Sequence, residues 1–197
     1  AAAIAILIGS RCPARALRTA QDLFRVLPLS RLTVDDLGSN QDTGLKARVN
    51  KASLGECDAF MSHSWADDGE RKYNRLQEHD WGTDAPTIWL DKACIDQTNI
   101  DASLAVLPIF LAGCQALLIL PGPSYAKRLW CVMEVFIFVQ MGGKGERMHI
   151  LPLDDGDDTK RMLTKFDAGR AQCFLARDRQ KLRAVIEASF GTFGPFN

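Results

Sequence analysis

The sequence predicts an α/β protein in which a parallel β-sheet is covered by helices on both faces. From Cys57 onward, short apolar runs alternate with longer segments of helical periodicity, which is the pattern of βαβ units. The run QALLILPGP is uniformly apolar along its strand-like part, as a strand buried on both faces should be. A chain of 197 residues, 47% hydrophobic and 24% charged, is long enough for one such domain with a substantial core and a modest extension.

The expected elements follow one another in this alternating order. We expect strands over 57–65, 86–94, 115–123 and 147–154, with a short fifth strand near 172–176. Helices are expected over 67–82, 99–114, 128–143, 157–166 and 178–191, the second of them broken or kinked at Pro108 and the third stopped by Gly142.

The first 55 residues are expected to form an extension to this domain, which would span 56–197. The apolar stretch 1–9 is shorter than the roughly 20 residues that cross a bilayer, so it predicts either the remnant of a membrane span or a short packed element. Residues 14–27 place Leu17, Ala20, Phe24 and Leu27 at helical spacing, which predicts an amphipathic helix. Polar, turn-like residues over 30–53 indicate a connector.

Charge and cysteine usage exclude several functions. Lys plus Arg and Asp plus Glu number 24 each, so no broad basic field predicts nucleic-acid binding. The six cysteines lie at long spacings without a C-x-x-C pair or a matching pair of histidines, which argues against a metal site. They are typical of reduced, mostly buried thiols in a cytoplasmic-type compartment, in an organelle that the sequence does not identify.

Topology predicts where a ligand would bind. In a flavodoxin-like sheet of order 2-1-3-4-5, ligands lie at the carboxyl ends of the strands, beside the point where the strand order reverses. This rule selects the segments 62–65 and 121–134, with the loop 91–97 at the border of the same crevice.

Glu134 is the single acid in the otherwise almost entirely apolar run RLWCVMEVFIFVQM. It could lie on the one exposed stripe of a buried helix, although it shares a helical face with Trp130, Cys131, Ile137 and Phe138. A carboxylate on such a face must be paired, protonated or open to a cavity, because burying it unpaired costs several kcal/mol. Candidate partners are Arg128, Lys127 and Lys92, and a cavity for a cationic substrate is the functional alternative.

The segments CDAFMSHSW, WLDKACID and LPIFLAGCQALLILPGPSYAKRLWCVMEV together resemble the TIR (Toll/interleukin receptor) domain family, most closely its plant-type and protist members. The most specific match is the string that contains Tyr125, Ala126, Trp130, Cys131 and Glu134. The resemblance covers roughly residues 56–153. It implies a flavodoxin-like three-layer α/β/α sandwich with a five-stranded parallel sheet of order 2-1-3-4-5, self-association in signalling assemblies and, in many members, cleavage of NAD+ at the nicotinamide–ribose bond.

In the NAD-cleaving members the glutamate of this string is catalytic, which implies Glu134 as the catalytic residue here. Nicotinamide leaves a pyridinium as a neutral molecule, so one carboxylate suffices to stabilise the oxocarbenium-like charge. No cofactor is expected, since NAD+ would be the substrate. Expected substrate-binding residues are the ring-stacking candidates and polar groups near Glu134, together with its two motif neighbours: Ser62, His63, Ser64, Trp65, Trp89, Lys92, Tyr125, Trp130 and Cys131.

Two smaller predictions concern single side chains. His63 could act as a base beside Ser62 or Ser64, but no G-x-S-x-G pattern accompanies it, so we expect it to tune the crevice. Cys131 lies beside Trp130 on an apolar helix, which favours packing over a reactive thiol.

Two functions therefore remain open. The first is a TIR-like interaction and assembly module that self-associates or binds protein partners. Such a module would be a soluble part of a larger membrane-associated protein or complex, tethered through its N-terminal apolar segment. The alternative is an NAD+ glycohydrolase with Glu134 as the catalytic residue. Fold alone does not decide between them.

Overall fold

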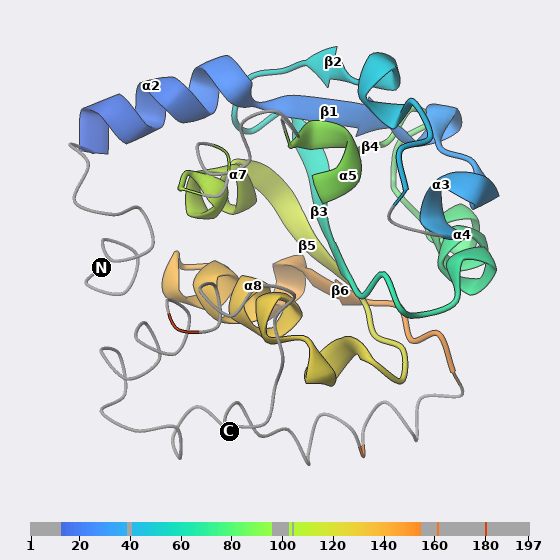
Figure 1. The fold of residues 1–197 in the computed structure, drawn as a ribbon. Coiled ribbons are helices and arrows are strands. Elements are labelled where there is room, and N and C mark those ends of the chain that lie inside the picture. Colours follow the sequence, from blue (N-terminus) through green and yellow to red (C-terminus); the bar gives the residue numbers. More distant parts are fainter. Residues whose placement is uncertain are drawn as a thin grey trace.

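The computed structural model describes residues 13–38, 41–95, 103, 105–154, 161 and 180 (Figure 1). The elements of this part, in chain order, are α2 (Pro13–Leu23), β1 (Arg25–Pro28), η1 (Leu29–Arg31), α3 (Val34–Gly38), η2 (Leu45–Arg48), β2 (Asn50–Lys51), β3 (Cys57–His63), α4 (Gly69–Glu78), β4 (Thr87–Trp89), α5 (Asp91–Cys94), α7 (Leu107–Ala112), β5 (Cys114–Leu120), η3 (Tyr125–Lys127), α8 (Leu129–Gln140), η4 (Gly145–Arg147) and β6 (Met148–Ile150).

The fold is α/β, with a mixed, mostly parallel sheet of six strands in the order β2-β1-β4-β3-β5-β6 within the described residues. The strands β4, β3, β5 and β6 pair in parallel, whereas β1 pairs antiparallel with both β2 and β4. The prediction of an entirely parallel five-stranded sheet is therefore wrong in strand count and in the order of the whole sheet. The expected strand near 172–176 and the helices expected over 157–166 and 178–191 lie outside the described residues, apart from Arg161 and Gln180.

The N-terminal segment supplies the two strands that the sequence prediction missed. The amphipathic helix expected over 14–27 is confirmed as α2 but ends at Leu23, and Arg25–Pro28 is strand β1. Pro28 disfavours a helical conformation for Leu27, so the helix could not continue to its predicted end. Of the four residues predicted to share a buried face, Ala20, Phe24 and Leu27 are buried and Leu17 is exposed, while Ala16 is buried in its place. The predicted division of the chain after residue 55 stays a prediction.

Two central strands and one helix carry most of the apolar sequence. β3 and β5 pair along almost their whole length, from Cys57 opposite Cys114 to His63 opposite Leu120. α8 begins and ends close to the predicted helix, and Gly142 follows it with φ +87°, a left-handed conformation that glycine adopts without strain. α7 and α8 pack against each other and contact β5 and β3 respectively.

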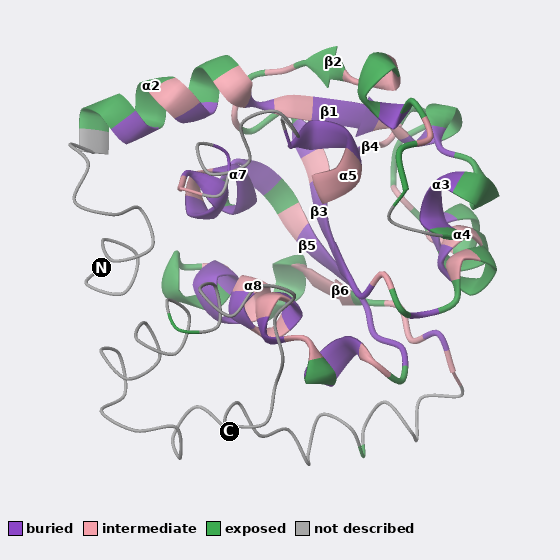
Figure 2. Cartoon of the chain, viewed as in Figure 1, coloured by how far each residue is buried: buried purple, intermediate pink, exposed green. Residues whose placement is uncertain are grey.

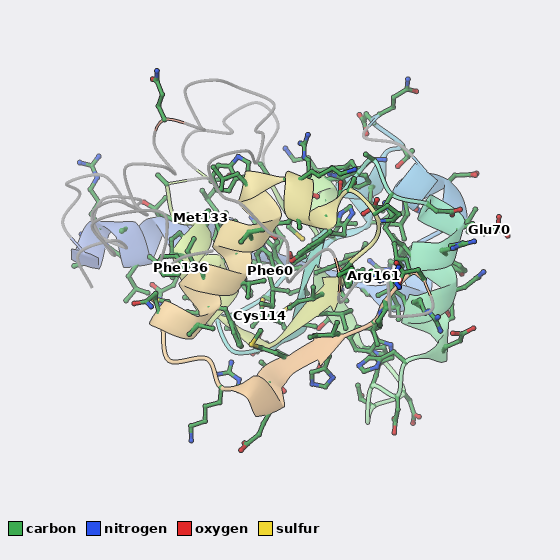
Figure 3. All side chains as sticks on the ribbon, turned by 90° about the horizontal axis from the view of Figure 1, so that it is seen from below. Phe60, Glu70, Cys114, Met133, Phe136 and Arg161 are labelled. Atoms are coloured by element: carbon green, nitrogen blue, oxygen red, sulfur yellow. The ribbon has the colours of Figure 1, made fainter. Side chains whose placement is uncertain are left out.

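The buried residues lie mainly on the central strands and on the sides of the helices that face them (Figure 2). In the view from below in Figure 3, Phe60 and Cys114 lie in the interior beneath α8, whereas Glu70 points outward from α4. Cys57, Cys94, Cys114 and Cys131 are all buried free thiols. The helix predicted over 67–82 is α4, which begins after Asp68 because the side chain of this residue caps it by accepting a hydrogen bond from the Arg71 amide at 3.0 Å.

The second predicted strand is shorter than expected, which affects the site. β4 ends at Trp89, and Asp91–Cys94 form the short helix α5 instead of continuing the strand. Asp91 thus starts a helical turn directly beyond the carboxyl end of β4. Among the described residues, none of the helices has the length and apolar character needed to cross a membrane; the apolar stretch 1–9 lies outside them.

Candidate functional site

A pocket of about 160 Å³ opens where β3, β4 and the helix after β5 meet. This is the position that the rule for parallel sheets selects, because β3 lies between β4 and β5 and the strand order reverses there. Its lining combines apolar and aromatic side chains with five polar or charged ones: Trp65, Trp89, Ile95, Leu107, Trp130, Cys131, His63, Ser64, Asp91, Arg128 and Glu134.

Glu134 reaches the pocket from α8, and its carboxyl group is held by the Ser62 hydroxyl, which in turn contacts the Tyr125 hydroxyl. The Ser62 hydroxyl donates a hydrogen bond to Oε2 of Glu134 at 2.5 Å. The same Ser62 oxygen lies 2.7 Å from the Tyr125 hydroxyl oxygen, and the carbonyl of Cys131 is an acceptor for the Tyr125 hydroxyl at 3.2 Å. Ser62 and Tyr125 are fully buried, so this network fixes the carboxyl group without filling the pocket in front of it.

The surroundings of Glu134 favour the protonated form of its carboxyl group. Burial raises the pKa of Glu134 to about 8, the charge of Asp91 adds to this effect, and the hydrogen bond from Ser62 opposes it. Within the described residues no ion pair joins Glu134 to Arg128 or Lys127, and the Lys92 ammonium donates instead to the carbonyl of Asp36 at 3.0 Å. Of the alternatives for Glu134, the structure therefore favours a carboxyl group that faces a cavity over one that is paired with a basic side chain.

Asp91 forms the second polar centre of the pocket. Its Oδ2 accepts a hydrogen bond from the Trp65 indole at 3.1 Å, and its Oδ1 accepts one from the Lys92 amide at 2.6 Å. Nε2 of His63 lies 3.9 Å from the same Oδ1. Burial works to raise the pKa of Asp91, but the nearby imidazole and these two donors outweigh burial and lower it. Asp91 is therefore a fixed negative charge beside His63.

A buried lysine contacts and stabilises the loop that carries Trp65. Lys72 on α4 donates from its ammonium to the carbonyl of Ser64 at 2.9 Å, and its nitrogen lies 5.6 Å from the centre of the Trp65 ring. Ser124 donates from its hydroxyl to the Ser64 hydroxyl at 2.7 Å, which links this loop to the one after β5. The pKa of Lys72 is lowered by its burial, against the opposing charges of nearby aspartates.

The pocket brings together most of the residues that the sequence predicted. Those that line it are His63, Ser64, Trp65, Trp89, Trp130, Cys131 and Glu134. Ser62 and Tyr125 contact Glu134 or its network from the protein interior, whereas Lys92 does not line the pocket and lies 5.5 Å from the Trp65 ring centre. Cys131 donates from its thiol to the carbonyl of His63 at 3.2 Å, as expected of a packed cysteine.

Asp91 and Arg128 are the polar residues of the pocket that were not among the predicted site residues. Both lie in segments that the topology rule selected, since Asp91 follows β4 and Arg128 follows β5 directly before α8. The position of Asp91 at a strand end was the signal that could have identified it.

Comparison of the chain with models of known protein families, with curated proteins and with solved structures finds no match. Within the part of the chain that the structure describes, no group of three or more His, Cys, Asp or Glu side chains is arranged to hold a metal ion.

Proposed function

We propose that the chain is an NAD+ glycohydrolase that cleaves the bond between nicotinamide and ribose. The observation that carries this proposal is the position of Glu134, whose carboxyl group is fixed by Ser62 at 2.5 Å and faces a pocket walled by the rings of Trp65, Trp89 and Trp130. An acid among aromatic rings fits a flat, cationic leaving group that becomes neutral as it departs.

The chemistry follows from the charge of the substrate. A pyridinium entering the pocket stabilises the ionised carboxylate, so substrate binding opposes the burial that raises the pKa of Glu134. As the C–N bond lengthens, positive charge moves onto the ribose, where the carboxylate stabilises it. The pocket of about 160 Å³ is smaller than the roughly 300–1,000 Å³ of sites that enclose a drug-sized ligand, so it fits the nicotinamide end of the dinucleotide and not the whole of it.

The resemblance of the segment around Tyr125 and Glu134 to NAD-cleaving TIR-family members supports this proposal. The run β4-β3-β5-β6 within the sheet has the order of the first four strands that the resemblance implies, whereas β1 and β2 extend the sheet beyond it. The interaction module, the self-association and the membrane tether that the sequence also predicted stay predictions, since no described contact bears on them.

The test is to incubate the full chain with NAD+ and separate the products by chromatography. We expect nicotinamide and ADP-ribose in equal amounts. The assay is run from low to high protein concentration with a crowding agent, so that an activity requiring self-association is not missed. A folded chain that leaves NAD+ intact under all these conditions would contradict the proposal.

Arg128 gives a prediction about substrate length. Arg128 lines the pocket, and within the described residues its guanidinium makes no hydrogen bond or ion pair. We expect it to contact the phosphates of NAD+. Arg128→Ala should raise KM for NAD+ about tenfold or more, the value of one charge-assisted hydrogen bond, and change KM for nicotinamide riboside less than about twofold. Lys127→Ala, an exposed neighbour outside the pocket, is the matched control. Equal losses on both substrates would contradict the assignment.

The raised pKa of Glu134 predicts the pH dependence of the reaction. The reaction requires the ionised carboxylate of Glu134, whose pKa in the free protein is about 8. We therefore expect kcat/KM for NAD+ to rise with pH and to level off above pH 8. Ser62→Ala removes the hydrogen bond that lowers this pKa and should shift the rise to higher pH. Ser64→Ala, whose hydroxyl bonds Ser124 instead, should leave the midpoint in place. Measured pH–rate profiles of the three proteins decide this.

A further inference from the structure

His63 is a buried polar side chain without a hydrogen-bond partner in a pocket that we have assigned to a substrate. Its side chain is 3% exposed, and within the part of the chain that the structure describes neither ring nitrogen makes a hydrogen bond. Buried polar groups in proteins are almost always paired, so an unpaired imidazole at a pocket wall points to a group that is supplied by a ligand or by reacting water.

The residues around the ring fix its orientation. The Trp65 ring meets the imidazole edge to face, with centres 4.3 Å apart and planes at 77°. Asp91, held by Trp65 and by the Lys92 amide, directs Oδ1 toward Nε2 of His63 at 3.9 Å. This distance is longer than a hydrogen bond, as catalytic contacts often are before the substrate binds. A proton on Nε2 facing Asp91 leaves Nδ1 as the basic nitrogen.

The serines beside His63 are engaged elsewhere, which removes the triad alternative. The Ser62 hydroxyl donates to Glu134, and the Ser64 hydroxyl accepts from Ser124. Neither is positioned by His63 as a nucleophile. No described side chain makes a hydrogen bond with the imidazole, and its nitrogens are closed to solvent in this structure, so its partner is a water molecule admitted when the pocket opens for the substrate.

We propose that His63, oriented by Asp91, is the general base that activates the attacking water; this inference rests on the proposed function. Once the C–N bond has broken and its electron pair has left with nicotinamide, the water oxygen forms a bond to the anomeric carbon of the ribose. Nδ1 of His63 takes the proton that the water loses and then releases it to solvent. The sum is NAD+ and water giving ADP-ribose, nicotinamide and one proton.

The partition between two nucleophiles tests this role. A pyridine base such as 3-acetylpyridine attacks the same carbon through a nitrogen that carries no proton, so its reaction needs no general base. With the full chain, NAD+ and 3-acetylpyridine, both products are measured for the wild type and for His63→Gln. We expect the ratio of hydrolysis to base exchange to fall about 100-fold in the variant, within the range for general-base catalysis, while base exchange stays within about threefold.

Asp91→Asn tests whether Asp91 positions the imidazole of His63, and it provides a second test of the proposal if His63→Gln does not fold. We expect the same ratio to fall about tenfold, because the amide no longer favours the correct tautomer. His149→Gln, on β6 and outside the pocket, is the control and should leave the ratio unchanged. An unchanged ratio in both site variants, or equal losses of both products, would overturn the role of His63 and leave the proposed function intact. A wild type that forms neither product would overturn both.

Discussion

We expect Glu134→Gln to lower kcat for nicotinamide release by at least about 1,000-fold, equivalent to about 4 kcal/mol of transition-state stabilisation. Glutamine has nearly the same shape and can still accept the hydrogen bond from Ser62, so the pocket keeps its form. It carries no charge, however, and cannot stabilise the positive charge that develops on the ribose. Because the ring walls that bind nicotinamide are unchanged, we expect KM to change far less than kcat.

Single-turnover nicotinamide release measures this effect, and Glu70→Gln provides the matched control. Glu70 lies on the outer side of α4 and is exposed (Figure 3), so its replacement should leave the rate unchanged. A Glu134→Gln protein that retains a tenth or more of the wild-type rate would rule out Glu134 as the catalytic residue.

The same variant carries an internal check on folding. The pKa of Glu134 is raised to about 8 from 4.5, so the stability contributed by its protonated form is present below pH 4.5 and is lost as the pH rises through 8. Glutamine stays neutral throughout. The thermal midpoint of Glu134→Gln relative to the wild type should therefore increase between pH 5 and pH 9. A variant that is inactive yet more stable at pH 9 has lost chemistry and not structure.

The part of the fold that sequence reasoning predicted is the part with long, uniform patterns. β5 and α8 are continuous apolar runs, and their types follow from length and flanking residues alone. β1 and β2 could not be predicted in this way because they have four and two residues, and β1 continues the helical spacing of α2. What makes Arg25–Pro28 a strand is its antiparallel pairing with β4, a contact between segments about 60 positions apart.

The residues of the candidate site also fall into those that local sequence patterns predict and those that depend on long-range pairing. Glu134 stood out because an acid in an apolar helix requires an explanation within its own neighbourhood. The pairing of His63 with Asp91 depends instead on the parallel register of β3 and β4, in which Phe60 lies opposite Trp89. That register brings the two strand ends together, and no local pattern in either segment encodes it. Side-chain contacts that depend on the register between strands are therefore the part of the site that could not be predicted from a single sequence.

Asp36 gives the largest expected effect on stability. This carboxylate is completely buried and accepts hydrogen bonds from Thr33, Thr43 and Arg48. The Thr33 amide donates to it at 2.8 Å at the start of α3, as in a capping box. Asp36→Ala removes the acceptor and leaves Arg48, with 29% of its side chain exposed, without its partner. We expect the free energy of unfolding to fall by about 2–3 kcal/mol, the cost of losing hydrogen bonds to a charged group, because Arg48 stays partly exposed to water.

Denaturant unfolding of Asp36→Ala beside Asp35→Ala measures this loss. Asp35 is the exposed neighbour in the same helical turn, and its replacement should cost less than about 0.5 kcal/mol. Burial works to raise the pKa of Asp36, but the hydrogen bonds from Thr43, Thr33 and Arg48 outweigh it and lower the pKa below 3.8. The stability that the carboxylate contributes is therefore present above pH 3.8 and is lost as the pH falls further, so the gap between wild type and Asp36→Ala should narrow in acid.

The same substitution tests a structural link between the N-terminal segment and the pocket. The Asp36 carbonyl accepts the hydrogen bond from Lys92, and the amide of Lys92 fixes Asp91. If Asp36→Ala loosens α3, the restraint on Lys92 weakens and the ratio of hydrolysis to base exchange should fall, although less than in Asp91→Asn. A destabilised variant with the wild-type ratio would mean that α5 holds Asp91 without help from the N-terminal segment, and that this segment contributes stability alone.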